Sequence, residues 1–238
     1  TIPMLYKLFS RLLYNRLEPT LDSCQSCDQA GFRKGRCTTD HLFTTAILQE
    51  TADEWQIPLF LATVDLKKAF DSVTHEAIWK AMVDQGVSTT YTTLLSKLYN
   101  NQTATVKTDC ESRPFNIERG VKQGDPLSSL LFNCVSESLM RKLKDKWESK
   151  EWGIPLQPHT KARLTNLRFA DDILLTATSL THLTHMLSDL EMLAGTVGLH
   201  IHPDKTKILH NNVISRTPRH VRTNTMHIEV CLLYTSPS

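Results

Sequence analysis

The sequence has little excess charge, no long apolar run and no repeated or low-complexity segment. No apolar stretch approaches the roughly 18 residues needed to span a bilayer, so we predict no transmembrane helix. Hydrophobic residues make up 40% of the chain and charged residues 22%, which excludes a collagen-like fibre or a disordered linker. The formal net charge is only +2, yet such a total can hide a basic groove beside an acidic site. The 238 residues therefore predict one large folded domain or two small ones.

Cysteine is also sparse. Six cysteines are scattered along the chain, without the density of a secreted disulfide scaffold. The chain starts at Thr1 and shows no pattern typical of a signal peptide. We therefore expect an intracellular, non-secreted protein, with the nucleus as a candidate compartment, and an interior piece of a longer open reading frame.

The last eight residues, 231–238, differ from the rest of the chain. They carry no charge, and they follow a basic stretch to which no turn pattern connects them. They resemble the translation of a common transposase-type sequencing adapter, so we expect them to be foreign to the gene. The alternative is a natural strand interrupted by Pro237.

Hydrophobic periodicity predicts alternating helices and strands. A buried strand is expected at 59–64, and hairpins are expected from 103–108 with 114–118 and from 164–169 with 173–177. Helical patterns cover residues 3–17, 39–55, 74–85, 88–100, a segment beginning near Pro126, and 180–194. Gly86 is expected to end the helix at 74–85. This order predicts an α+β domain with helices on one face of a small antiparallel sheet.

Three acids fall at positions that favour chemistry. Asp65 ends the predicted buried strand, and Asp171 and Asp172 occupy the turn of the second hairpin. Carboxylates close together repel one another, and apolar surroundings raise that cost. Bound Mg²⁺ removes the cost, and two such ions can stabilise the attacking and leaving oxygens of phosphoryl transfer. From the residues alone, it is equally possible that Asp171 and Asp172 form an ordinary polar turn and that Asp65 caps a helix, with no metal bound.

Five sequence blocks resemble reverse transcriptases of non-LTR, LINE-like retrotransposons in order and spacing. They are Gln29-Ala-Gly-Phe-Arg-Lys-Gly-Arg-Cys-Thr-Thr-Asp-His-Leu42, Val64-Asp-Leu-Lys-Lys-Ala-Phe-Asp-Ser-Val73, Arg119-Gly-Val-Lys-Gln-Gly-Asp-Pro-Leu-Ser128, Phe169-Ala-Asp-Asp-Ile173 and Gly198-Leu-His-Ile-His-Pro-Asp-Lys-Thr-Lys207. The fourth block has Phe169 where many relatives have Tyr. The resemblance implies the fingers and palm of a right-hand polymerase over residues 1–210, the start of a connection towards a missing thumb over 211–230, and the adapter-like segment over 231–238.

The resemblance also implies catalytic roles. Asp65 and Asp171 would hold two Mg²⁺ ions, for which Mn²⁺ is a possible substitute, and Asp172 would be a third nearby acid. Lys205 matches a lysine thought to protonate the leaving pyrophosphate. These assignments make the acids both catalytic and metal-binding residues.

Nucleotide-binding roles are implied for five further positions. Phe70 would lie under the sugar of the incoming nucleotide and exclude a ribose 2′-hydroxyl, although most phenylalanines simply pack in a core. Gln123 and Gly124 would lie beside the nucleotide and the template base. Arg33 or Arg36 would bind the triphosphate with its planar guanidinium, although each could equally be a solvated surface charge.

The expected activity is RNA-directed DNA polymerisation, in which dNTPs extend a primer 3′-hydroxyl on an RNA template. The expected partners are the RNA template, a DNA or RNA primer, dNTPs and further domains of the same polyprotein, a thumb and often an endonuclease, with no membrane. The alternative is a catalytically inactive RNA-binding remnant of a truncated element.

Two other patterns are interpreted as non-functional. Cys24, Cys27, Cys37 and His41 have a zinc-like spacing, but two of them fall inside the first block, where the family binds no metal. His182, His185 and Asp189 share one side of a predicted helix, opposite its leucines, and are interpreted as a solvated face.

Overall fold

The computed structural model describes residues 4–100, 102–108, 112–157, 160, 162–213 and 217–233. Its contacts divide the chain into two compact units. The first unit contains residues 1–25, 68–138 and 197–199, and the second contains 26–67, 139–196 and 200–238. Within the described part of the chain, no helix combines the length and the apolar content needed to cross a membrane.

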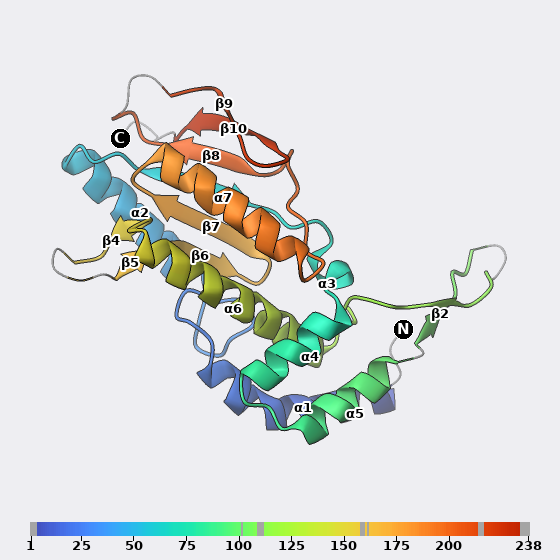
Figure 1. Cartoon of the computed structure of the whole chain (residues 1–238). Coiled ribbons are helices and arrows are strands. Elements are labelled where there is room, and N and C mark those ends of the chain that lie inside the picture. The colour runs from blue at the N-terminus through green and yellow to red at the C-terminus, as the bar shows by residue number, and fades with distance from the viewer. Residues whose placement is uncertain are drawn as a thin grey trace. The chain divides into compact units, whose positions relative to one another are not determined.

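The first unit is mainly helical (Figure 1). Its elements are α1 (Met4–Ser23), α3 (Ala69–Ser72), α4 (His75–Asp84), α5 (Thr89–Tyr99), the first half of α6 (Pro126–Ser149), and the hairpin of β2 (Thr103–Ala104) and β3 (Phe115–Asn116). Helix α1 runs beyond the predicted residue 17, although Pro19 lies inside it, because Leu17 and Leu21 continue the buried stripe that Leu13 begins. Helices α4, α5 and α6 confirm the predicted periodicity, whereas the short helix α3 was not predicted.

Side-chain caps and glycine set the limits of the paired helices α4 and α5. The Thr74 hydroxyl accepts a hydrogen bond from the Ala77 amide at the start of α4, and the Ser88 hydroxyl accepts one from the Thr90 amide at the start of α5. Gly86 follows α4 with φ of +82°, a conformation that glycine adopts without steric cost. The helical stop predicted at this glycine is confirmed.

The second unit contains a six-stranded sheet in the order β6-β7-β1-β8-β10-β9. Its strands are β1 (Phe60–Val64), β6 (Asn166–Phe169), β7 (Asp172–Ala177), β8 (Lys207–His210), β9 (His220–Arg222) and β10 (His227–Leu232). All neighbours are antiparallel except β8 and β10, which are parallel. A separate small hairpin joins β4 (Ile154–Pro155) to β5 (Arg163–Leu164). The predicted α+β class and antiparallel palm sheet are thus confirmed, with one parallel pair added.

Helices cover the two faces of this sheet unequally. On one face, α7 (Leu180–Gly195) packs along β7 and β1 through Leu183, Met186, Leu187 and Leu190 (Figure 1). On the other face, Ala52 near the end of α2 (Thr38–Glu54) packs with Leu61 and Leu174. Further along β1 on that second face, Thr63 is exposed. The sheet is therefore left open on the side that leads toward Asp65.

The predicted solvated face of α7 is only partly covered. His185 is exposed, as predicted, although Trp152 stacks on His182 and His185, with ring centroids 5.7 and 5.3 Å away. Asp189 accepts hydrogen bonds from Lys146 Nζ at 2.7 Å and from Trp147 Nε1 at 3.2 Å. Residues outside α7 cover the Asp189 end of this face, which helical periodicity does not report.

The adapter-like segment begins inside a strand. Cys231 and Leu232 belong to β10 and pair with Leu209 and His210 of β8. Residues 234–238 lie outside the described residues. The foreign origin of residues 231–238 stays a prediction.

Candidate active site

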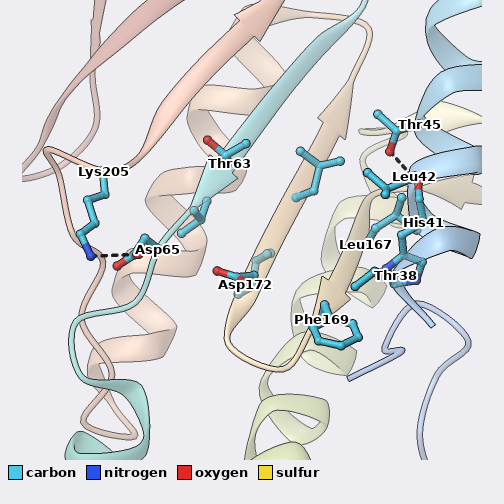
Figure 2. A pocket seen from close by; sticks show the side chains of 13 residues that line it. Thr38, His41, Leu42, Thr45, Thr63, Asp65, Leu167, Phe169, Asp172 and Lys205 are labelled. Carbon is cyan, nitrogen blue, oxygen red and sulfur yellow. Dashed lines mark hydrogen bonds and ion pairs between the residues drawn. The ribbon is translucent and has the colours of Figure 1, made fainter. Parts of the chain in front are cut away.

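Asp65 lies at the end of the central strand β1. The last antiparallel pairs of β1 with β7 are Thr63 with Leu174 and Val64 with Ile173. One further step along this register brings Asp65 opposite Asp172, and Figure 2 shows the Asp65 carboxylate turned toward Lys205. The Asp65 carbonyl accepts a hydrogen bond from the His202 amide at 2.8 Å, which fixes the backbone beyond the strand end.

Lys205 forms an ion pair with Asp65 (Figure 2). Its Nζ lies 3.4 Å from Asp65 Oδ2, and the lysine side chain is 61% exposed. An ion pair this exposed contributes little to stability, about 0–1 kcal/mol. The structure therefore brings together Asp65 and Lys205, two residues that the sequence predicted for catalysis.

Asp171 and Asp172 lie at a tight turn between β6 and β7. Phe169 and Asp172 form the last pair of the hairpin, so Ala170 and Asp171 are its two loop residues. Ala170 has φ of +60°. A positive φ at the first loop position is the feature of type II′ turns, which favour glycine there. Ala170 is therefore held in a conformation that an alanine alone disfavours.

Burial and like charges both act on Asp172. Burial, followed by the charges of Asp171 and Asp65, raises the pKa of Asp172 above its ordinary value, and Lys205 opposes the rise. Among the described residues, no three His, Cys, Asp or Glu side chains come together closely enough to hold a metal by themselves. Carboxylate donors with this repulsion fit Mg²⁺, which keeps several waters and takes oxygens from substrate phosphates.

Asp172→Asn is expected to raise the melting temperature in EDTA at pH 7. A carboxyl whose pKa is higher in the folded state stabilises the fold at low pH, and that contribution is lost as the pH rises through its folded pKa. Ionised Asp172 therefore opposes folding at neutral pH, and asparagine removes the charge while keeping the shape. Calorimetry should show that the difference in melting temperature between Asp172→Asn and the unmodified protein becomes smaller toward about pH 4, where carboxylates become protonated.

The matched control for this experiment is Asp204→Asn, because the Asp204 side chain is 93% exposed. Its melting temperature should stay near that of the unmodified protein. A lower melting temperature for Asp172→Asn than for the control would contradict the proposed repulsion.

A pocket of about 540 Å³ opens beside the acids, between the sheet and the start of α2. Thr38, His41 and Leu42 line its helical side, and Asp65 and Asp172 line its sheet side (Figure 2). Burial lowers the pKa of His41 despite the nearby charges of Asp28 and Asp40. Sequence reasoning missed His41 as a lining residue, since it marked His41 only as part of the first block and of the zinc-like spacing.

The two candidate triphosphate ligands lie in the loop before α2. Arg33 Nη1 donates hydrogen bonds to the carbonyls of Ser26 at 2.6 Å and Gln29 at 3.1 Å. Some of the N–H groups of Arg33 therefore stabilise the loop itself. Arg36 is exposed in the same loop. Their roles toward a triphosphate stay predictions.

Phe70 and the loop carrying Gln123 come together in the first unit. Phe70 stacks on the buried Phe132, with ring centroids 4.6 Å apart and planes at 16°. Its carbonyl accepts a hydrogen bond from the Val121 amide at 2.7 Å, and Gln123 Nε2 donates to Asp71 Oδ1 at 3.0 Å. Phe70 itself is half-buried. This arrangement fits both interpretations of Phe70, a core ring and a ring that presents one edge to a nucleotide.

Gly124 meets a conformational requirement. Its φ is +80°, and apart from its chain neighbours no protein atom lies within 4 Å of where a Cβ would stand.

Next to Gly124, the buried Asp125 accepts hydrogen bonds from the Ser10 hydroxyl and from the Leu127 amide at 3.2 Å. Burial, with the charges of Tyr99 and Asp125, raises the pKa of Tyr6, and Lys122 lies 3.8 Å from the Tyr6 ring centroid. Sequence reasoning missed this network, which anchors the Gln123 loop to α1.

The comparison with protein families decides the identity of the fold. The family described as "Reverse transcriptase (RNA-dependent DNA polymerase)" matches residues 1–227. The chain belongs to the reverse transcriptase family. The resemblance of the five sequence blocks to reverse transcriptases is thereby confirmed. The relatives that the chain matches support the non-LTR class.

Those relatives are proteins of R2 retrotransposable elements. A Pol polyprotein of an R2 element from Nasonia vitripennis is 34% identical over 152 residues, which cover 63% of this chain and 14% of that protein. One from Popillia japonica is 32% identical over 183 residues, covering 72% of this chain and 23% of that protein. This reverse transcriptase chain thus spans less than a quarter of the length of either relative.

Solved structures of telomerase share the fold. Apo telomerase from Candida tropicalis, truncated from its C-terminal domain, aligns with a TM-score of 0.63 and 14% identity over 92% of this chain and 43% of that chain. Telomerase of the same organism in complex with a TWJ fragment of telomeric RNA aligns with a TM-score of 0.64 and 13% identity over 83% of this chain and 33% of that chain. At this identity the likeness supports the fingers and palm fold alone.

Proposed function

We propose that this reverse transcriptase chain carries the polymerase centre of a non-LTR retrotransposon and extends a primer 3′-hydroxyl with dNTPs on an RNA template. The single observation that carries the proposal is the strand register, which, continued one step beyond β1, brings Asp65 opposite Asp172 of β7, with Asp171 at the adjoining turn. Acids on neighbouring strands with mutual repulsion are a suitable binding place for divalent cations.

The following roles of the chain's own residues belong to the proposal, and that geometry supports them. Asp65 and Asp171 would hold two Mg²⁺ ions and Asp172 would support them. When bound, such ions stabilise the charge that develops on the attacking and leaving oxygens. Lys205, whose side chain is mostly exposed beside Asp65, would donate a proton to pyrophosphate.

RNA-templated primer extension tests the proposed function. The chain, extended through the downstream polymerase segment of its natural reading frame, should add the complementary dNTP and reject the three others. Addition should stop in EDTA and return with Mg²⁺ or Mn²⁺. RNA binding without any Mg²⁺-dependent addition would contradict the proposal and would favour the inactive RNA-binding remnant.

Phe70→Val is expected to relax sugar selection. A stacked ring is stiff, so it can close the space of a 2′-hydroxyl, and a smaller side chain reopens that space. Discrimination against rNTPs should fall by about 1–3 kcal/mol, while dNTP addition stays within about tenfold. Parallel single-nucleotide extension with dNTP and rNTP measures both rates.

The control is Phe132→Leu, which removes the same ring stack from its fully buried side. This change should lower the rates of dNTP and rNTP addition together, because packing in the core is lost. If Phe70→Val gives the same pattern, with an unchanged rNTP to dNTP ratio, Phe70 is only a core residue.

A further inference from the structure

The segment that precedes α2 runs along the outer edge of the acid-bearing hairpin. Gln29 forms a parallel bridge with Arg168 of β6. The Arg168 amide donates to the Asp28 carbonyl at 2.7 Å, and the Ala30 amide donates to the Arg168 carbonyl at 2.9 Å. Residues 28–30 therefore act as a short extra strand beside β6, and all of these groups belong to the second unit.

The side chain of Gln29 continues this pairing onto the turn itself. Its Oε1 accepts a hydrogen bond from the Ala170 amide at 3.0 Å and another from the Gly31 amide at 2.8 Å. Its Nε2 donates to the Ala170 carbonyl at 3.2 Å. Gln29 is completely buried. One carboxamide thus binds both backbone polar groups of the residue that precedes Asp171.

The hydrogen bonds of Gln29 stabilise an unfavourable backbone conformation at Ala170. A non-glycine residue at φ of +60° has an energetic cost, and this conformation persists where the surroundings hold it. Two of the three buried hydrogen bonds of Gln29 bind the backbone of Ala170, and they can offset that cost. Without them, the turn is free to relax, and Asp171 and Asp172 move with it.

We propose that Gln29 is a positioning residue that holds the Ala170 turn so that Asp171 and Asp172 face Asp65. The role of these acids toward metal rests on the proposed function. Only a carboxamide combines an acceptor and a donor at this length, because glutamate lacks the donor and would bury a further negative charge beside the acids. Mg²⁺ demands near-ideal octahedral geometry, so a small shift of the turn weakens the site.

Gln29→Met tests the proposal, because methionine has a similar length and offers no amide. The matched control is Gln85→Met in the first unit. Gln85 is also buried, and its Nε2 donates to the Cys134 carbonyl at 2.8 Å and to the Ser138 hydroxyl at 2.9 Å. Both variants lose a buried amide and should lose similar thermal stability, but only one of them contacts the turn.

Two measurements on the full chain separate positioning from stability. Amide hydrogen exchange followed by NMR should show Ala170 exchanging about tenfold faster in Gln29→Met than in Gln85→Met. Mn²⁺ titration by electron paramagnetic resonance should show about fivefold or greater loss of affinity in Gln29→Met alone. Unchanged Ala170 exchange, or unchanged Mn²⁺ affinity at faster exchange, would overturn the positioning role.

Ala170→Gly supplies a rescue that a merely structural role does not predict. Glycine adopts a positive φ without help, so adding this change to Gln29→Met should restore most of the lost Mn²⁺ affinity. No recovery in the double variant would contradict the proposal, and Gln29→Asn replaces Gln29→Met if the latter does not fold. Equal Mn²⁺ binding by the unmodified protein and by Asp65→Asn would instead overturn the proposed function, while Ala170 exchange still reports on the turn.

Discussion

Asp65→Asn and Asp171→Asn are each expected to abolish Mg²⁺-dependent primer extension while leaving the fold intact. Asparagine keeps the size of the side chain but removes the charge that binds a cation, and transfer of a phosphoryl group depends on that cation for charge stabilisation. We expect a rate loss of about three orders of magnitude or more, which corresponds to roughly 4 kcal/mol of transition-state stabilisation. Single-turnover addition of one dNTP on an RNA template measures it.

The controls separate chemistry from folding. Asp204→Asn changes an exposed carboxylate one residue from Lys205 and should extend primers at a near-normal rate. Circular dichroism and the melting temperature in EDTA should show that both active-site variants remain folded. Near-normal extension by either Asp65→Asn or Asp171→Asn would remove that acid from the metal site.

Gly31→Ala is expected to have the next largest effect. A Cβ at residue 31 would stand 2.1 Å from the Ala170 nitrogen and 2.8 Å from its Cα, and these are backbone atoms of the acid-bearing turn. Gly31 does not have a positive φ, so only the lack of space for a Cβ opposes the substitution. The turn must move by about 1 Å or more, and a displacement of that size can lower catalysis about a hundredfold.

Gly195→Ala is the matched control, because no atom lies within 4 Å of its added Cβ and its φ is ordinary. Gly31→Ala should also lower stability by about 1–3 kcal/mol through overpacking, whereas the control should not. Urea unfolding and primer extension on both variants test the two effects. Normal extension by Gly31→Ala would show that the turn tolerates displacement.

The local parts of the site were predictable from sequence. Asp65 was placed at a strand end and Asp171 and Asp172 at a hairpin turn, because the apolar runs beside them have strand periodicity and the acids interrupt them. The start of α6 at Pro126 and the stop after α4 at Gly86 followed from the backbone preferences of proline and glycine. Each of these features depends on a few neighbouring residues.

Contacts between distant residues were not predictable in this way. Gln29 and Ala170 are 141 positions apart, and nothing in the periodicity near either one indicates that a side chain reaches the turn. The parallel pairing of β8 with β10 and the stacking of Trp152 on α7 are equally non-local. Pattern reasoning identifies which face of an element is apolar, and it does not identify the partner that covers a polar face.

The count of bound Mn²⁺ ions tests the central claim most directly. With primer, RNA template and a dNTP present, electron paramagnetic resonance should find about two Mn²⁺ ions per chain in the active polymerase, as a two-metal site requires. Asp65→Asn should lower that count to one or fewer under the same conditions, and Asp204→Asn should leave it unchanged. An equal count in Asp65→Asn and the unmodified protein would contradict the assignment of this strand end as the metal-binding centre.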